Sequence, residues 1–258
     1  MASAPQQGLP LLYNDLTPIS SQVHGDWRMR EIRGAKFLHG VHAVPLLAEE
    51  FIQASRFYPI VFSLGSDPVP LALMGLNEGI NTFVNEEGMF PDDYYIPAYV
   101  RRYPFLLAKL RPDADELSLC VDPTSEVIGA FEDGEPLFEN GAPSERTKQI
   151  LGFCEQMEQA SGVTAAFFRD LSEHKLLTDG EFSAQPDGVT QPFIYRGFQI
   201  VSEEALKNLR GDVARKWIQS GLLPLVYAHL FSLQRMTDVF GRQYVQGKMP
   251  ALQDFPLN

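Results

Sequence analysis

One short segment, residues 94–105, concentrates the side chains best suited to recognition chemistry. It holds four of the nine tyrosines of the protein within ten residues, together with two adjacent arginines and Phe105. Aromatic rings stack on planar groups, and a guanidinium forks a carboxylate or a phosphate. The same residue types are enriched at the centres of protein interfaces. The segment therefore predicts a binding surface, whose candidate residues are Tyr94, Tyr95, Tyr99, Arg101, Arg102 and Tyr103.

The prolines of this segment limit its local structure. Pro97 suits the first position of a helix, and Pro104 ends any helix just before it. On such a helix Tyr95, Tyr99 and Arg102 lie on one face, because residues three or four apart are neighbours. Two alternatives to partner binding stay open: a small-ligand site, and a structural corner in which the tyrosines bond to backbone and the arginines pair with local acids. Those acids are Glu86, Asp92 and Asp93.

Two histidines, His39 and His42, could form a metal site with Glu49 or Glu50 as a carboxylate ligand. At a spacing of three they share a face only on a helix, and Gly40 between them weakens a helix. No His-Glu-x-x-His or paired-cysteine motif accompanies them. We therefore expect no metal. The sequence has no Gly-x-Ser-x-Gly elbow for Ser-His-Asp chemistry. It also has no glycine-rich phosphate loop for a nucleotide, so we expect no cofactor.

His229 and a basic stretch at residues 27–36 are the remaining candidates. His229 has apolar neighbours, which is typical of a hydrogen-bonded, partly buried histidine rather than a general base. In the basic stretch Arg28 and Arg30 would line one face of a strand, opposite Trp27. A solvated sheet face paired with acids is the favoured interpretation, and docking of an acidic partner is the alternative.

Composition restricts the partners and the compartment. The 258 residues include 33 acidic and 21 basic side chains, a formal charge of −12, which disfavours binding to nucleic acid or to anionic membranes. The N-terminus has no features of a signal peptide, and the most apolar stretch, 221–233, is shorter than the roughly 20 residues that span a bilayer. Cys120 and Cys154 are expected to be buried, unreactive thiols. We expect a cytoplasmic, acidic protein with no membrane span.

The elements that position these residues change character once along the chain. Strand signals dominate from about residue 27 to residue 122, and a short helix is expected within 44–57. From about residue 143 the apolar spacing becomes helical. The β-prone runs are residues 58–64, 70–76, 80–84 and 117–121, with a later strand at 191–201. The first two runs are separated by a turn composition and predict an antiparallel hairpin.

The second half predicts several helices. Ser144 caps a helix that Gly162 separates from a second one, Ser202 caps a helix that reaches Trp217, and the final helix begins after Gly221. We therefore predict an α+β fold, with an antiparallel sheet in the N-terminal half and helices from the C-terminal half packed on it. Residues 1–20 are predicted to form a flexible lead-in, residues 21–240 a single α+β domain, and residues 241–258 a C-terminal tail.

Several phrases of the sequence, taken in order, resemble the bacterial SapC family over about residues 10 to 240. The most specific of them is the run from Tyr95 to Phe105. The supporting phrases are Tyr58–Phe62, Gly75-Leu76 with Asn81 and Gly88, Asp122, Leu137-Phe138 with Gly141, Gly197-Phe198, and Leu222–Ser232. The resemblance implies a role linked to surface layers, and gene neighbours similar to flavin-dependent tryptophan halogenases and outer-membrane receptors. It implies no set of catalytic residues.

These observations lead to one functional hypothesis and two alternatives. The leading hypothesis is an accessory or binding protein that uses the 94–105 segment as its recognition surface. The resemblance implies that it assists a halogenase-like or uptake system, with a halogenase-like neighbour as the partner. The first alternative is an enzyme for a small carboxylate-bearing or peptide substrate, in which Arg101 or Arg102 clamps the carboxylate and a tyrosine or His229 moves protons. The second is a surface-layer-associated protein.

Overall fold

The computed structural model describes residues 8–111, 116–185 and 192–249, which divide into two compact units. Unit 1 comprises residues 1–33 and 99–159, and unit 2 comprises residues 34–98 and 160–258. Each unit is therefore built from two stretches of chain that are far apart in the sequence. The mixed composition, with antiparallel sheets in the first half and helices mostly in the second, confirms the α+β class.

Unit 2 is organised around a five-stranded antiparallel sheet with the strand order β12-β13-β4-β5-β3. The predicted hairpin is confirmed: β4 pairs with β5, and Val61 lies opposite Leu71. Both faces of β4 are buried, which explains why the sequence there is an unbroken apolar run. The strands are β3 (Ala43–Pro45), β4 (Ile60–Phe62), β5 (Pro70–Leu73), β12 (Leu177–Ala184) and β13 (Phe193–Val201).

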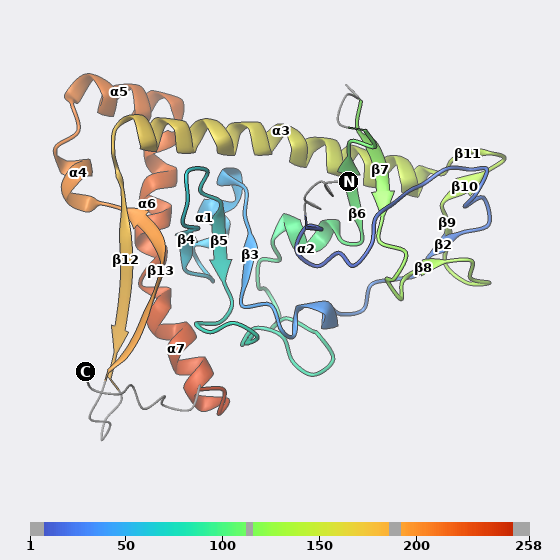
Figure 1. The fold of residues 1–258 in the computed structure, drawn as a ribbon, viewed down its shortest axis with the longest axis horizontal. Helices are drawn as coiled ribbons and strands as arrows, with labels where there is room; N and C mark the ends of the chain where they lie inside the picture. The colour runs from blue at the N-terminus through green and yellow to red at the C-terminus, as the bar shows by residue number, and fades with distance from the viewer. Residues whose placement is uncertain (1–7, 112–115, 186–191, 250–258) are drawn as a thin grey trace, which may run out of the picture. The chain divides into compact units, whose positions relative to one another are not determined.

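Helices of the C-terminal half pack on this sheet. Helix α6 contacts β4, β13 and the short α1, and α7 contacts β12; both helices run along the long β12–β13 hairpin in Figure 1. Gly221, in a left-handed conformation, separates α5 from α6, as predicted for the last helix boundary. The helices are α1 (Phe51–Ala54), α4 (Glu203–Lys207), α5 (Gly211–Ser220), α6 (Leu222–Ser232), α7 (Arg235–Val245), and the 3-10 turns η1 (Lys36–Leu38) and η2 (Ala48–Glu50).

The core of unit 2 is aromatic. The ring of Phe62 on β4 contacts those of Phe167 and Phe168, and Phe51 on α1 meets Phe167 edge-on at 5.5 Å. These rings bury a large apolar area, and pairs of this geometry contribute about 0.5–1.5 kcal/mol each beyond that burial. Phe167 and Phe168 come from helix α3 (Glu145–Glu173), which contributes residues to both units.

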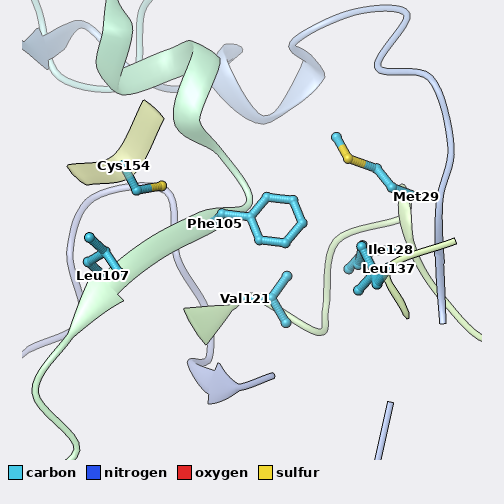
Figure 2. Close-up of a cluster of buried hydrophobic side chains, with 7 residues drawn as sticks. All are labelled: Met29, Phe105, Leu107, Val121, Ile128, Leu137 and Cys154. Carbon is cyan, nitrogen blue, oxygen red and sulfur yellow. The ribbon is translucent and has the colours of Figure 1, made fainter. Parts of the chain in front are cut away.

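Unit 1 contains smaller sheets and its own apolar cluster. Strands β1-β7-β6 form one three-stranded sheet and β8-β2-β9 another, while β10 and β11 form a hairpin. Figure 2 shows the cluster Met29, Phe105, Leu107, Val121, Ile128, Leu137 and Cys154. The elements are β1 (Thr17–Pro18), β2 (Arg28–Met29), β6 (Phe105–Ala108), β7 (Ser118–Val121), β8 (Ile128–Gly129), β9 (Glu135–Pro136), β10 (Phe138–Glu139), β11 (Ala142–Pro143) and, with its first residue in unit 2, α2 (Ala98–Arg102).

Two predictions, a strand at residues 80–84 and a helix boundary at Gly162, are wrong. In the first case side-chain hydrogen bonds outweigh the β-propensity of the sequence, and in the second the packing of a long helix outweighs the low helix propensity of glycine. Residues 80–84 form no strand: the Asn81 side-chain oxygen accepts the backbone N–H groups of Phe83 and Val84, which holds an irregular turn. Gly162 does not end a helix, because α3 continues through it. The loss of propensity at one glycine, about 1 kcal/mol, is small beside the packing of a 29-residue helix.

Other element boundaries also differ. The helix predicted from Ser202 to Trp217 is two helices, α4 and α5, although Ser202 does cap the first. The short helix within 44–57 is confirmed as α1, but Val44 belongs to β3. Strand β12 and helix α7 were not predicted.

The predicted lead-in and tail each contain ordered secondary structure in their described parts. Residues 1–7 and 250–258 lie outside the described residues. Within the lead-in, Tyr13 is buried and β1 pairs with β7. At the other end, α7 continues to Val245, and Gln243 is fully buried. Among the described residues, no helix combines the length and the apolar composition needed to cross a membrane.

Candidate functional site

The candidate segment 94–105 is divided between the two units. Tyr94 and Tyr95 belong to unit 2, whereas Tyr99, Arg101, Arg102 and Tyr103 belong to unit 1. The predicted helix exists as α2, which follows Pro97 directly and ends before Pro104. Each half of the segment has its own environment.

In unit 1, Arg102 and two tyrosines form an internal cluster. The Arg102 guanidinium lies over the Tyr99 ring, 4.9 Å from its centroid, which confirms that these two side chains share a helix face. Arg102 is only 8% exposed, its Nη1 lies 4.0 Å from Glu158 Oε1, and its Nε is buried without a partner among the described atoms. The carboxylate nearest to Arg102 is thus on α3 rather than in the local sequence.

The tyrosines of unit 1 are held by backbone acceptors and by neighbouring rings. The Tyr99 hydroxyl donates to the Leu11 carbonyl at 2.7 Å, and Tyr103 is 6% exposed, with its ring edge-on to Tyr13 at 5.4 Å. Burial raises the pKa values of Tyr99 and Tyr13, and the nearby Arg102 guanidinium offsets this only in part. These phenols therefore stay protonated near neutral pH and act as hydrogen-bond donors.

Arg101 is the exposed member of the unit 1 cluster. Its guanidinium lies 5.2 Å from the centroid of the Phe153 ring on α3, and its side chain reaches the surface. A ring-supported guanidinium at a surface is a side chain that can stack on a planar group or fork a carboxylate.

In unit 2, Tyr95 bonds to a buried carboxylate. Its hydroxyl donates to Glu50 Oε1 at 2.7 Å, and the same oxygen accepts the backbone N–H of Ala98 at the start of α2. Glu50 is 6% exposed, and its other oxygen accepts the Leu47 N–H at 2.7 Å. The Tyr95 carbonyl accepts the hydroxyl of buried Tyr58. Tyr95 is therefore fixed by the fold on both its side chain and its backbone.

Tyr94 faces an open cleft on unit 2. The cleft has a volume of about 510 Å³ and is bounded by α7 and by the residues that follow α1. The rings of Tyr94 and Phe57 contact each other at 4.9 Å on its wall. Its lining residues are Arg56, Phe57, Tyr94, Arg235, Thr237, Asp238, Gly241 and Arg242.

Arg242 is the central cation of this cleft. It donates through Nη2 to the Tyr94 hydroxyl, and its guanidinium lies 4.9 Å from the Phe83 ring centroid and 5.4 Å from that of Tyr94. Arg242 is not among the candidate residues predicted from the sequence, because residues 241–258 are predicted to form a tail. The available signal was the spacing of Arg235, Asp238 and Arg242, which places all three on one helix face.

The three candidate histidines are His39, His42 and His229, and His229 lies apart from the other two in the core of unit 2. His39 Nε2 lies 2.8 Å from the Asn85 carbonyl, burial lowers the pKa of His42, and the described residues contain no cluster of three or more potential metal ligands. His229 is fully buried: its Nε2 accepts the Val201 N–H, and its Nδ1 lies 2.9 Å from the Ile60 carbonyl. Burial lowers the pKa of His229 to about 4, so it is a neutral core residue, as its neighbours predicted.

The basic stretch at 27–36 pairs largely with nearby acids and carbonyls. Arg30 forms an ion pair with Asp133 at 2.7 Å, Arg28 donates to the Gly134 carbonyl, and Arg33 pairs with Glu31. These contacts support the favoured interpretation of a solvated face.

The family of the chain is indicated by a comparison with protein-family models. A family model described as SapC matches residues 19–239. No curated protein and no solved structure matches the chain. The match covers most of both units and includes the whole of the 94–105 segment.

Proposed function

The chain belongs to the SapC family, and from this premise we propose that it is an accessory binding protein that recognises a protein partner through the 94–105 segment. The observation that carries the proposal is that each half of this segment is held by hydrogen bonds within its own unit. The hydroxyls of Tyr95 and Tyr99 are engaged with protein acceptors, while Arg101 is exposed and supported by a ring. A recognition surface that is already ordered loses little conformational entropy when it binds.

The same contacts favour binding over the enzyme alternative. An enzyme that moves protons needs a titratable group whose pKa lies near the working pH. Burial moves the pKa of Tyr99 upward and that of His229 to about 4, and both His229 ring nitrogens face backbone groups. The proton-moving role considered for these two residues therefore has little support.

A pull-down tests the partner assignment. The partner that the family resemblance implies is a halogenase-like protein encoded nearby. In the experiment this partner is immobilised and probed with the full chain. We expect Arg101→Ala and Tyr99→Ala to reduce capture at least fivefold, since aromatic and arginine anchors carry most of the energy of an interface, about 2 kcal/mol or more each. The matched control is Arg146→Ala, an exposed arginine of the same unit that lies outside both candidate surfaces. Capture by the two variants equal to that of the control would reject the segment as the recognition surface.

The compartment is a separate part of the proposal. We place the protein in the bacterial cytoplasm, and not in a surface layer, because its two cysteines are free thiols, which is typical of a reducing compartment. Cell fractionation with an antibody to the native chain tests this placement. Recovery in the envelope fraction, resistant to a high-salt wash, would favour the surface-layer alternative instead.

A further inference from the structure

The cleft on unit 2 is locally basic, although the protein as a whole is acidic. Three of its lining residues are arginines and one is an aspartate, in a chain of net charge −12. Asp238 pairs with Arg235 at 2.8 Å, so these two charges offset each other. Within the described part of the chain, neither Arg56 nor Arg242 has a carboxylate within ion-pair distance. The cleft thus has two cations with no anionic partner in the described structure.

The hydrogen-bonding groups of Arg242 and Tyr94 are also incompletely used. A guanidinium has five N–H donors, and that of Arg242 donates one hydrogen bond among the described residues, to the Tyr94 hydroxyl. That hydroxyl accepts from Arg242 and keeps its own proton to donate. The partly buried guanidinium and the adjacent phenol O–H both have unused hydrogen-bond donors. An oxyanion can accept hydrogen bonds from both groups at once.

The walls of the cleft add an aromatic preference. Phe57 and Tyr94 present contacting rings, and the Arg56 guanidinium lies 5.6 Å from the Phe57 ring centroid. The volume of about 510 Å³ lies within the roughly 300–1,000 Å³ range of small-molecule sites. A ligand that carries a flat ring beside its charge would contact these walls while its charge meets the arginines.

We propose that this cleft binds a small planar organic carboxylate, with Arg242 and the Tyr94 hydroxyl holding the carboxylate, Arg56 adding charge, and the Phe57 and Tyr94 rings contacting the planar group. The site goes beyond the proposed protein-binding function and, apart from Tyr94, uses none of its residues. Failure of one proposal therefore leaves the other standing.

Calorimetric titration of the full chain with 2-naphthoate tests the site. Its uncharged analogue 2-naphthamide has the same ring system, acetate has the charge without the ring, and inorganic phosphate is an oxyanion without a ring. We expect 2-naphthoate to bind at least tenfold more tightly than each of these three, because hydrogen bonds to a charged group and ring contact both contribute. Equal binding of naphthoate and naphthamide would overturn the role of the arginines, and equal binding of naphthoate and phosphate would overturn the role of the rings.

Variants locate the binding in this cleft. Arg242→Gln is expected to weaken naphthoate binding about tenfold or more, and exposed Arg56→Gln several-fold. The control is Arg215→Gln, an exposed arginine on α5 of the same unit that does not line the cleft. Arg56→Gln keeps the test decisive if Arg242→Gln fails to fold, because its side chain is at the surface. Naphthoate affinity that is the same for Arg56→Gln, Arg215→Gln and the unmodified chain would reject the site.

Discussion

The hydroxyl of Tyr95 and the carboxylate of Glu50 are joined by a 2.7 Å hydrogen bond, although 45 residues separate them in the chain. The carboxylate is buried and also accepts two backbone N–H groups, those of Leu47 and Ala98. One side chain thus satisfies donors at the start of η2, at the start of α2 and in the recognition segment. Buried carboxylates are tolerated when donors surround them in this way.

Replacing Glu50 should therefore destabilise unit 2. Glu50→Ala leaves three donors without an acceptor, the buried Ala98 N–H and the partly buried Leu47 N–H and Tyr95 hydroxyl, and we expect it to lower the free energy of unfolding by about 3 kcal/mol. Tyr95→Phe removes one donor and should cost about 1 kcal/mol. Urea unfolding followed by circular dichroism measures both changes. The matched control is Glu49→Ala, an exposed neighbour that should change stability by less than about 0.5 kcal/mol. Equal effects of Glu49→Ala and Glu50→Ala would contradict the role given to the Glu50 carboxylate.

The parts of the fold that were predictable are those governed by local patterns. The hairpin at β4 and β5 follows from two apolar runs around a turn, and the boundary at Gly221 follows from the preference of glycine for a left-handed conformation. The start of α3 after Ser144 follows from the preference of serine for the N-cap position, and the Ser144 hydroxyl there accepts the Thr147 N–H. In these places local chemistry and tertiary structure agree.

The cleft was not predictable, because it depends on contacts that are distant in the sequence. Arg242 meets Tyr94 across 148 residues, and neither residue carries a local signal for the other. Strand β12 was missed for a similar reason. Its exposed residues give no apolar run, and its pairing with β13 is what makes it a strand. The contacts of Glu50 with Tyr95 and Ala98 likewise follow from the tertiary fold.

Acid should destabilise unit 2 through His229. Its pKa is lowered to about 4 in the folded protein against about 6.5 in the unfolded chain, so the unfolded state binds a proton that the folded state does not. The stability that neutral His229 provides is fully present above pH 6.5 and is lost as the pH falls from 6.5 towards 4. The loss approaches about 3 kcal/mol across that window. Urea unfolding at a series of pH values measures it.

Variants identify the histidine responsible for this acid dependence. His229→Gln should have a lower free energy of unfolding at pH 7.5, because the His229 ring bridges the backbone of Val201 and Ile60. The stability of this variant should also depend less on pH between 6.5 and 4. The surface variant His39→Gln should keep the slope of the unmodified chain. If His229→Gln retains the full slope, then another group causes the acid sensitivity.

The two adjacent arginines of α2 should respond differently to removal. Arg102 is buried over the Tyr99 ring and near Glu158, so Arg102→Ala removes packing as well as charge and should cost about 2 kcal/mol. Arg101 lies at the surface, and Arg101→Ala should change stability by less than about 0.5 kcal/mol. Thermal unfolding of both variants, side by side, measures the difference. Equal destabilisation would mean that Arg101 also has a structural role, and would weaken its use as a binding probe.

Both thiols of the chain should be slow to react in the native state. Cys154 lies in the apolar cluster of unit 1, where burial raises its pKa to about 11, and burial also raises the pKa of Cys120. Because the thiolate is the reactive form, little of it is present at pH 8, and the sulfur atoms are also shielded from reagent. We expect Ellman's reagent to modify neither cysteine within minutes in native buffer, and both rapidly in 6 M guanidinium chloride. A thiol that reacts quickly in the native protein would show that the cluster drawn in Figure 2 opens readily, and that the apolar core of unit 1 is less closed than its burial indicates.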